Sequence, residues 1–529
     1  MTPAISAREW RRVLVLALAL AALTSIPYVL GWLRSDATHI YSGATLDLMD
    51  YNSYLAKMQQ GAAGQWRFTI TYTSEEHAGG FVYPFYLLLG HIAGWTGLSL
   101  PLVYQLARLL CALGMVAAIY RLMAALLAAP AWRWIACLLA CAGGGLGWLQ
   151  LLIAPTAVGG ISPIDFWLMD GFPYFSALTF PHFTAAVALM ALALAGFLAL
   201  LRATRASALA GAALCMFSLT LIHPFGGGLT FLIAGLYGAL ALAQRRTNLR
   251  RALPAGLALA LPAAPILGYD AWLFSTQPAF RAWAAQNITL SPPPGHYLAS
   301  YGLLLALAVA GLTWALPQRG PLWLAGAWLL AVALLVYAPT NLQRRFLEGV
   351  MVPLGALATV GATLLLRRIR ARAWRRRAWL LLVALTWPSN LALTAGVSAA
   401  ALARSPSLFY PGDLIAAVDW VGANAGPETV VFSALETGNL IPARTGRRVY
   451  LGHWIETQDY ARKREEVSAF FAGALTEAAQ RALLRAGHIT HVFHGPAERA
   501  LGGFEPARAA YLEPAFCAGD VVLYRVREP

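Results

Sequence analysis

Long apolar stretches alternate with clusters of arginine along most of the chain. A membrane-spanning helix needs about 20 predominantly apolar residues, and such stretches recur through the first three quarters of the 529 residues. Two of them separate each arginine cluster from the next. The implied membrane helices are 13–33, 101–123, 134–153, 177–201, 208–223, 226–243, 252–272, 298–316, 321–338, 347–366 and 378–398. The pattern predicts a polytopic α-helical membrane protein with about 11 transmembrane helices.

The arginine clusters also predict how the chain crosses the membrane. Lys and Arg beside membrane helices are retained in the cytoplasm, and here they gather around residues 8–12, 121–133, 202–205, 245–251, 319 and 367–377. The N-terminus is then cytoplasmic, and the eleventh helix ends outside. Among the acidic residues before residue 405, only Glu9 falls inside. Polar chemistry is therefore expected on the outer face, although acids there are also simply tolerated.

Two shorter segments in the first external loop, residues 34–100, have a different pattern. In residues 47–61, apolar side chains at Tyr51, Tyr54, Leu55 and Met58 form the i, i+3, i+4, i+7 stripe of an amphipathic helix, and Gly61 is a stop signal. Residues 83–95 are too short and too marked by proline for a confident span. We predict two interfacial helices, which lie along the outer membrane surface.

The pattern changes again after Arg404. Short strand-like runs such as "ETVVFSA", "RRVYLG", "ITHVFHG" and "DVVLYRV" alternate with helical segments such as "YARKREEVSAFFAG". The sequence therefore predicts a transmembrane domain over residues 1–403 and a small α/β domain over residues 404–529. Because the predicted helices are odd in number, the second domain is expected outside the membrane.

Composition and charge narrow the class of function. Only 12% of the residues are charged, against about 25% in soluble domains. The net charge of +15 combines +17 before residue 405 with −2 after it. Topology and attraction to anionic lipid headgroups explain the positive part, so nucleic acid is not an expected partner. No nucleotide-binding motif is present, and the five cysteines show no disulfide or metal-ligand spacing.

The arrangement resembles the GT-C superfamily of membrane glycosyltransferases. Members carry an acidic motif in a long external loop directly after the first helix, and they use a polyprenyl-linked sugar donor. Here the corresponding stretch is "DLMDYNSYLAKM", with Asp50 at the position of the loop acid. Many members have adjacent Asp and Glu residues, whereas here Tyr51 follows Asp50 and the second acid, Asp47, lies three positions earlier. This departure leaves use of a divalent metal, Mg²⁺ or Mn²⁺, open, and because no nucleotide-binding motif is present, no nucleotide cofactor is expected.

On this resemblance the two loop acids are the catalytic candidates. Attack by an acceptor hydroxyl on an anomeric carbon needs a base, and a positioned carboxylate contributes roughly 10²–10⁴-fold. We favour Asp50 as this base. The alternative is structural: Asp47 as the N-cap, with Asp50 three residues later, is an ordinary helix start, and for Asp47 we favour capping.

A lipid phosphate leaving group needs positive charge beside it, preferably the planar fork of an arginine. Arg344 and Arg345 lie at the outer end of a late helix, and the run from Arg345-Phe346 to Pro353 is similar to the segment that GT-C enzymes carry near the donor phosphate. Their alternative role is snorkelling to the membrane interface. Arg108 lies inside a predicted helix and is a functional candidate by default, or it pairs with an acid such as Glu75 or Glu76.

Weaker candidates complete the expected site. His182 and His223 each stand beside proline at an outer helix end, where a sugar-binding and a structural role are about equally supported. Further substrate-binding candidates in the first external loop are Tyr54, Glu75 and His77. Asp165 and Asp170 lie in the second external loop, where oligosaccharyltransferases place metal-binding acids, although their spacing is not a recognised metal motif.

The sequence thus predicts an inverting glycosyltransferase on the outer face of a bacterial inner membrane. Its expected partners are a polyprenyl-phosphate sugar donor, membrane lipids and an acceptor that is a glycan, a lipid or a protein. The main alternative is a transporter or lipid-glycan flippase, which predicts charged or broken helices near the bilayer midplane and repeat symmetry. The charges gather instead at outer helix ends, and no internal repeat is visible. A third alternative is a scaffold that has lost catalysis.

Overall fold

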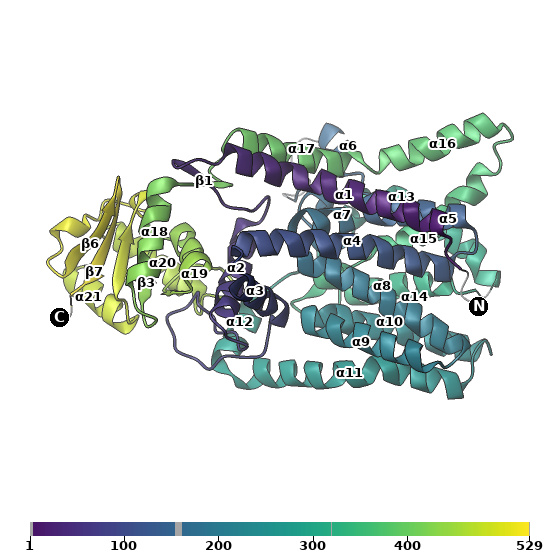
Figure 1. Cartoon of the computed structure of the whole chain (residues 1–529), viewed down its shortest axis with the longest axis horizontal. Helices are drawn as coiled ribbons and strands as arrows, with labels where there is room; N and C mark the ends of the chain where they lie inside the picture. Colours follow the sequence, from purple (N-terminus) through teal and green to yellow (C-terminus); the bar gives the residue numbers. More distant parts are fainter. Residues whose placement is uncertain (1–3, 154–160, 319, 528–529) are drawn as a thin grey trace. The chain divides into compact units, whose positions relative to one another are not determined.

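The structure is a computed structural model that describes residues 4–153, 161–318 and 320–527. The chain divides into two compact units (Figure 1). The helical unit comprises Met1–Pro27, Leu106–Tyr269 and Thr289–Ser398, and the mixed unit comprises Tyr28–Gln105, Asp270–Ile288 and Ala399–Pro529. Four of the five boundaries fall within helices, namely α1 (Ala7–Arg34), α4 (Leu100–Leu126), α11 (Leu249–Thr276) and α17 (Pro388–Leu402), and the fifth, between Ile288 and Thr289, lies outside any helix.

The helical unit is built from packed apolar helices. In it α13 packs against α15, α15 against α5, and α10 against α8, α9 and α14. Small residues permit close approach: a Cβ at Gly361 in α15 would lie only 1.9 Å from the Leu307 carbonyl oxygen in α13. The other elements are α5 (Pro130–Ala142), α6 (Gly147–Ile153), η1 (Ile164–Phe166), η2 (Met169–Gly171), α7 (Pro173–Thr179), α8 (Pro181–Arg202), α9 (Ala206–Ile222), α10 (Pro224–Ala243), α13 (Pro294–Ala315), η3 (Leu316–Gln318), α14 (Trp323–Leu335), η4 (Gln343–Leu347), α15 (Met351–Leu366) and α16 (Arg372–Leu385).

Each of the eleven predicted membrane segments contains a helix, but their lengths differ. In the described part of the chain six helices are long and apolar enough to span a membrane, or up to eight if the bent pairs α5 with α6 and α16 with α17 each count as one span. Three more, α9, α14 and α15, are apolar but shorter. Because α14 has 13 residues, it is about 20 Å long, less than a hydrocarbon core of about 30 Å. A multi-pass membrane protein is confirmed, whereas the count of about 11 is not.

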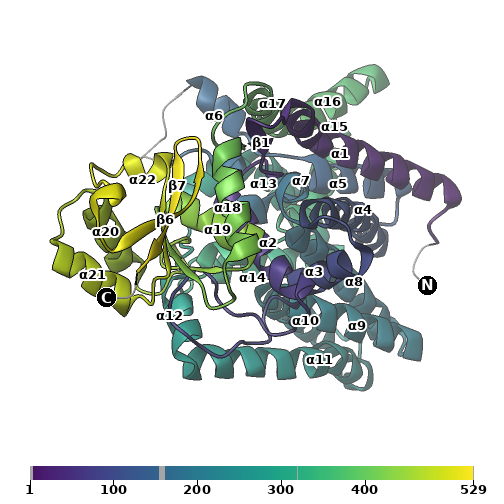
Figure 2. The same cartoon turned by 60° about the vertical axis from the view of Figure 1, so that its left-hand side comes forward.

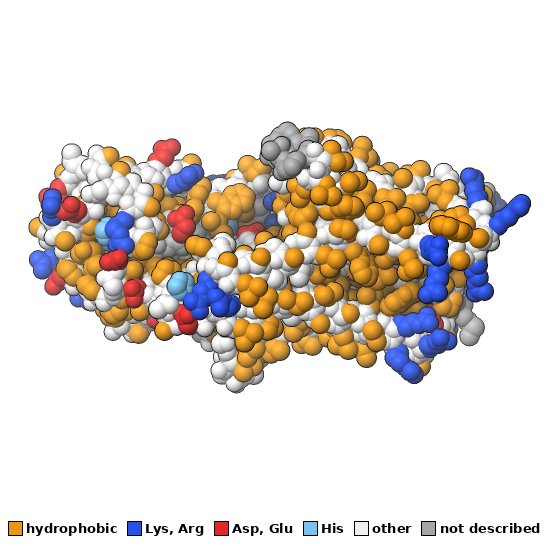
Figure 3. Space-filling model, turned by 90° about the horizontal axis from the view of Figure 1, so that it is seen from above, with side chains coloured by type: hydrophobic (Ala, Val, Ile, Leu, Met, Phe, Trp, Pro, Cys, Tyr) orange, Lys and Arg blue, Asp and Glu red, His pale blue; other side chains and the backbone are white. Residues whose placement is uncertain are grey.

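Charged and apolar side chains separate on the surface of the helical unit. Hydrophobic side chains cover much of the face that Figure 3 shows, and Lys and Arg side chains gather at one end of the helices. This distribution agrees with the arginine clusters of the sequence, of which Arg319 lies outside the described residues. The orientation of the chain in a membrane stays a prediction.

A five-stranded sheet organises the C-terminal part of the mixed unit. Its strand order is β4 (Arg448–Val449), β3 (Val430–Phe432), β5 (His491–His494), β7 (Val521–Val526) and β6 (Leu512–Ala518). The helices α20 (Tyr460–Phe471) and α21 (Glu477–Ala486) supply Val467, Phe470, Phe471 and Leu484 to the core on one face. On the other face Trp420 of α18 (Gly412–Asn424) packs against Phe516 and His491 (Figure 2). The predicted strands and helices of this region are confirmed.

Two predicted helices of the external loop are also present in the mixed unit, α2 (Leu48–Ala62) and α3 (Pro84–Thr96). The sequence suggested that Gly61 ends α2, but the helix continues through Gly61 to Ala62. Gly61 lies within the helix where α3 passes, and a Cβ there would lie 2.1 Å from the Leu87 carbonyl oxygen. The polar side chains of Asn52, Ser53 and Lys57 on α2 are buried.

The cover over α2 comes from the C-terminal region. The helix α19 (Leu435–Thr445) packs along it, and the Asn52 amide donates to Asn439 Oδ1 at 2.8 Å. The remaining elements of the unit are β1 (His39–Tyr41), which pairs with β2 (Phe409–Pro411), α12 (Pro278–Gln286), α22 (Pro496–Arg499) and η5 (Pro506–Arg508). The first external loop and the C-terminal region therefore fold as one unit.

Candidate functional site

The first turn of α2 holds both candidate catalytic carboxylates. Asp47 is the N-cap, and its side chain accepts a hydrogen bond from the Asp50 backbone N–H at 3.3 Å. Asp47 adopts a left-handed backbone conformation, with φ of 49°, which aspartate tolerates better than most residues. The cap that the sequence predicted for Asp47 is present, and it leaves Asp50 on the first helical turn.

Asp50 is oriented by a histidine that sequence reasoning missed. His453 Nε2 lies 3.2 Å from Asp50 Oδ1. The other ring nitrogen, Nδ1, accepts from the backbone N–H groups of Ile455 and Glu456 at 3.2 and 3.3 Å. Because Nδ1 is an acceptor, a neutral ring carries its proton on Nε2 and donates it to Asp50. The side chain of His453 is 2% exposed and that of Asp50 is 25% exposed, so a buried group holds a carboxylate that solvent can reach.

A buried ion pair fixes the same face of α2 to the same C-terminal segment. Lys57 Nζ lies 2.8 Å from Glu456 Oε1 and 2.6 Å from Ser53 Oγ. It also lies 4.3 Å from the centre of the Tyr83 ring. Ser53 and Lys57 follow Asp50 by three and seven residues, which places all three on one helix face. This pair fixes the segment that carries His453 and so positions the histidine against Asp50.

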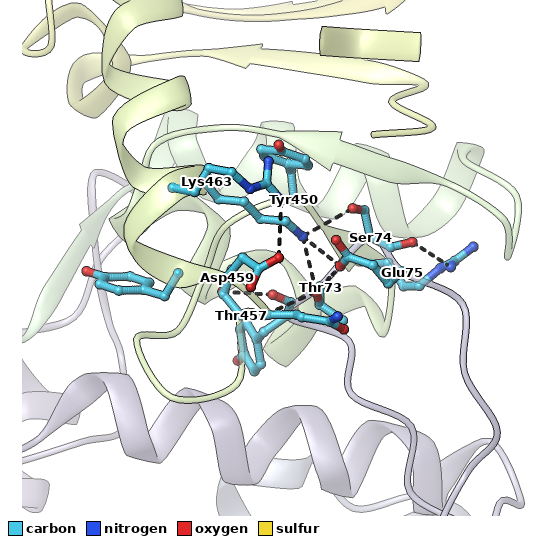
Figure 4. A network of polar contacts seen from close by, with 12 residues as sticks. Thr73, Ser74, Glu75, Tyr450, Thr457, Asp459 and Lys463 are labelled. Carbon is cyan, nitrogen blue, oxygen red and sulfur yellow. Dashed lines mark hydrogen bonds and ion pairs between the residues drawn. The ribbon is translucent and has the colours of Figure 1, made fainter. Parts of the chain in front are cut away.

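A second buried pair involves Glu75, a candidate substrate-binding residue (Figure 4). The Lys463 ammonium lies 2.6 Å from Glu75 Oε2 and also donates to the hydroxyls of Thr73 and Ser74. Although burial raises the pKa of Glu75, the charge of Lys463 brings that pKa below its ordinary value. The Glu75 carboxylate therefore joins the external loop to α20 through this ion pair. The neighbouring Glu76 carboxylate lies 3.5 Å from the Arg448 guanidinium.

Two other candidates of the external loop make contacts within it. His77 Nε2 accepts from the Ile70 backbone N–H at 2.9 Å, and Nδ1 donates to the Glu75 carbonyl oxygen at 3.0 Å. Burial lowers the pKa of His77, which favours the neutral ring. Tyr54 is 9% exposed and stacks on Tyr86 with ring centres 4.3 Å apart. These contacts shape the loop around α2.

In the helical unit, Arg345 pairs with Asp170. Arg345 Nη1 lies 3.1 and 3.3 Å from the two carboxylate oxygens of Asp170. The Asp170 side chain is 5% exposed, whereas that of Arg345 is 19% exposed. Arg345 extends from η4 and Asp170 from η2, two short turns that the sequence did not predict to meet. The pair orients the guanidinium, whose planar fork has five N–H donors.

The two candidate histidines lie near this pair. The rings of His182 and His223 are 6.4 Å apart, and Phe183 contacts both of them and the Arg345 guanidinium. His223 Nδ1 caps α10 by accepting from the Gly226 N–H at 3.0 Å. The structure therefore brings four of the predicted residues, Asp170, His182, His223 and Arg345, into one cluster, and it gives His223 the structural role as well.

Glu348 belongs to the same region and was not predicted. Its side chain is fully buried, and within the described residues neither carboxylate oxygen has a hydrogen-bond partner. Asp170 and Arg345 are its nearest electrostatic influences. A buried carboxyl group is costly unless it is paired or neutralised, so this position belongs with the polar cluster and not with the apolar core.

The other two candidate arginines are Arg108 and Arg344, and their contacts differ. Arg108 is 1% exposed and donates to the Ala177 carbonyl oxygen at 2.8 Å and to the hydroxyls of Thr24 and Ser25. The Arg344 guanidinium lies 5.4 Å from the centre of the Trp167 ring. Neither contact assigns a function, and both residues stay candidates.

The two acids proposed as metal ligands are held by different partners. Asp165 accepts from the Gly147 backbone N–H at 3.0 Å and from the Ser300 hydroxyl at 3.2 Å, while both oxygens of Asp170 face Arg345. Over residues 4–153, 161–318 and 320–527 no group of three or more His, Cys, Asp or Glu side chains could hold a metal ion. Asp165 and Asp170, held apart by these partners, therefore do not form a donor set that fits a divalent metal.

The fold that these elements define is also found in an oligosaccharyltransferase and an arabinofuranosyltransferase of known structure. The chain is similar to the oligosaccharyltransferase AglB from Archaeoglobus fulgidus, in complex with an inhibitory peptide and a dolichol-phosphate, at 14% identity and a TM-score of 0.57 over 92% of this chain and 70% of that one. It is also similar to ArnT from Cupriavidus metallidurans bound to undecaprenyl phosphate, at 14% identity and a TM-score of 0.51 over 99% and 100%.

A third similar structure is the arabinofuranosyltransferase AftD from Mycobacteria, at 15% identity and a TM-score of 0.56 over 100% of this chain and 40% of that one. No protein-family model and no curated protein matches the sequence. At these identities the likeness shows the fold alone, and the function has to be argued from the site.

Proposed function

We propose that the protein is a glycosyltransferase that moves a sugar from a polyprenyl-phosphate carrier to an acceptor hydroxyl. The shared fold supports this proposal, and so do the lipid phosphates bound to AglB and ArnT. The acceptor is a glycan, a lipid or a protein. The proposed location is the outer face of a bacterial inner membrane, with a cytoplasmic N-terminus, a transmembrane domain over residues 1–403 and an extracytoplasmic region over residues 404–529.

The observation that carries the proposal is the contact between Asp50 and His453. In the proposed reaction the acceptor oxygen attacks the anomeric carbon from the side opposite the phosphate, which inverts the configuration. The new carbon–oxygen bond forms as the bond to phosphate breaks, polyprenyl phosphate leaves with the electron pair, and the Asp50 carboxylate takes the acceptor proton. His453 positions Asp50 for this transfer, and Asp47 caps the helix that carries it.

Arg345 is the proposed ligand of the donor phosphate. Its guanidinium is partly exposed and oriented by Asp170, and a planar guanidinium matches two phosphate oxygens. His182 and His223 are the proposed hydrogen-bond donors beside it. Arg344 and Arg108 are secondary candidates for the positive charge that binds the donor phosphate.

The experiment is the substitution Asp50→Asn in the full-length protein, assayed with an undecaprenyl-phosphate sugar. Asparagine keeps the shape but cannot take the proton, so sugar transfer should fall by at least about 10²-fold while the thermal unfolding temperature is nearly unchanged. Asp520→Asn, at an exposed carboxylate of a turn, is the matched control. Full transfer by the Asp50→Asn protein would end the assignment, and movement of the lipid-linked sugar across vesicles without transfer would favour a flippase.

A further inference from the structure

The mixed unit contains a polar cavity that the proposed chemistry does not use. Its volume is about 500 Å³, and it lies between the C-terminal end of α2, the loop that follows it, and the segments around β4. The side chains that line it are mostly amides, hydroxyls, carboxylates and guanidinium groups, including those of Gln59, Gln65, Thr71, His77, Glu428 and Arg447. A cavity with several convergent polar groups is a typical small-molecule site.

Two lining groups have unused hydrogen-bonding capacity. Thr71 is 4% exposed, yet within the described residues its hydroxyl has no hydrogen-bond partner. The Nε atom of Arg447 is also buried without one. A buried polar group without a partner costs about 1–3 kcal/mol, so both groups are suited to a ligand that supplies the missing partner.

The charges around the cavity are balanced. Glu75 is paired with Lys463, which does not itself line the cavity (Figure 4), and Arg448 lies 3.5 Å from Glu76 and 3.3 Å from Glu428. With Arg447 included, three cations face three carboxylates. Such a cavity has no large excess of either sign to attract an anion or a cation, and it favours a neutral ligand rich in hydroxyl groups.

The cavity is connected to the candidate base by a rigid element. Gln59 lies nine residues after Asp50 on α2, and a rise of 1.5 Å per residue separates them by about 14 Å. We propose that the cavity binds a neutral saccharide unit of the acceptor, remote from the hydroxyl that reacts. The acceptor role rests on the proposed function. Binding of this saccharide unit would supply binding energy, remote from the reaction, that orients the reacting hydroxyl of the acceptor.

Thr71→Val separates a binding role from a structural one. Because the Thr71 hydroxyl has no partner in the part of the chain that the structure describes, its removal should leave the unfolding temperature of the ligand-free protein unchanged or higher. The matched stability control is Thr69→Val, whose hydroxyl donates to Gln60 Oε1 at 3.2 Å, and this change should lower the unfolding temperature. Loss of one ligand hydrogen bond in Thr71→Val should weaken saccharide binding by about 2- to 12-fold.

Binding is measured on the purified full-length protein with maltotriose, cellotriose, mannotriose and N-acetylchitotriose as neutral probes, and with inorganic phosphate as the anionic probe. The expected result is that at least one saccharide stabilises the protein, that Thr71→Val and Arg447→Met both weaken this effect, and that phosphate gives none. Stabilisation by phosphate alone, by no probe, or by a saccharide equally in all variants overturns the proposal.

The same assay distinguishes this inference from the proposed function. Asp50→Asn should abolish transfer and keep saccharide binding, because Asp50 is about 14 Å away along α2. Saccharide binding without transfer by the wild type would leave the cavity assigned and the glycosyltransferase proposal wrong. Sugar transfer without saccharide binding would support the glycosyltransferase proposal and overturn the assignment of the cavity.

Discussion

The two nitrogen atoms of His453 have separate partners, and two substitutions can remove them one at a time. Asparagine can place an amide oxygen near the position of Nδ1 and keep the acceptor for the N–H groups of Ile455 and Glu456. It cannot reach Asp50. Glutamine can place an amide N–H near the position of Nε2 and keep the donor to Asp50, but it leaves the two backbone N–H groups without an acceptor.

The expected magnitudes follow from the hydrogen bonds that each change removes. A hydrogen bond to a charged group contributes about 1.5–3 kcal/mol, so if it serves to orient Asp50 in the transition state, His453→Asn should lower sugar transfer by about 10- to 150-fold. The unfolding temperature should change little. His453→Gln should keep most of the transfer and lose stability, because a buried N–H without an acceptor costs about 1–3 kcal/mol.

The assay combines sugar transfer, with kcat and KM separated, and thermal unfolding of the same detergent-solubilised preparations. A positioning role predicts a loss in kcat, and it predicts that His453→Asn has no further effect in the Asp50→Asn background, since the two residues act as a unit. Full transfer by His453→Asn, or equal and additive losses in both backgrounds, would refute the reasoning.

Three further predictions use other contacts of the structure. Asp47→Asn should keep transfer and stability because asparagine caps about as well, whereas Asp47→Ala should cost roughly 0.5–2 kcal/mol in unfolding free energy; loss of transfer in Asp47→Asn at unchanged stability would move the chemistry to Asp47. Arg345→Lys should raise the KM for the lipid-linked donor roughly tenfold, since lysine lacks the bidentate fork, and an unchanged donor KM at normal protein levels would favour snorkelling. Lys463→Met should cost about 1–3 kcal/mol, less than a fully buried pair because Glu75 is partly exposed. The pKa of Glu75 is lowered in the folded state, so the stability it contributes is present above pH of about 4.5 and lost below it; the acid-side fall in unfolding temperature should be shallower in Lys463→Met, and an unchanged slope would contradict the pairing.

Local patterns predicted the local structure well. The apolar stripe of residues 51–58 predicted α2, and the alternating runs after Arg404 predicted the strands β3, β4, β5 and β7. These features depend on spacing within a few residues. Local spacing says nothing of burial that distant segments produce: the polar side of α2 is covered by α19, which lies almost 400 residues further along the chain.

The site was predictable only in part for the same physical reason. The resemblance to GT-C enzymes, together with side-chain chemistry, predicted Asp50 and Arg345, and a place beside proline at outer helix ends predicted His182 and His223. The contacts of Asp50 with His453 and of Arg345 with Asp170 span 403 and 175 residues, and no local pattern carries such a pairing. The stretch around His453 was visible only as a region rich in polar and aromatic side chains.

The buried polar side of α2 also has a consequence for the order of synthesis. The partners of Asp50 and Lys57 lie about 400 residues further along the chain, and a ribosome adds about 5–20 residues per second. For about 20–80 s, then, the nascent helix has neither its histidine nor its glutamate. Until Glu456 is made, burial of the Lys57 ammonium among aromatic rings lacks its carboxylate partner and is unfavourable, so we expect the external loop to stay open until then. Closure of the loop, and with it the orientation of the proposed base, is therefore among the last events in the making of the molecule, and a chain that stops before residue 453 carries the carboxylate without the means to hold it.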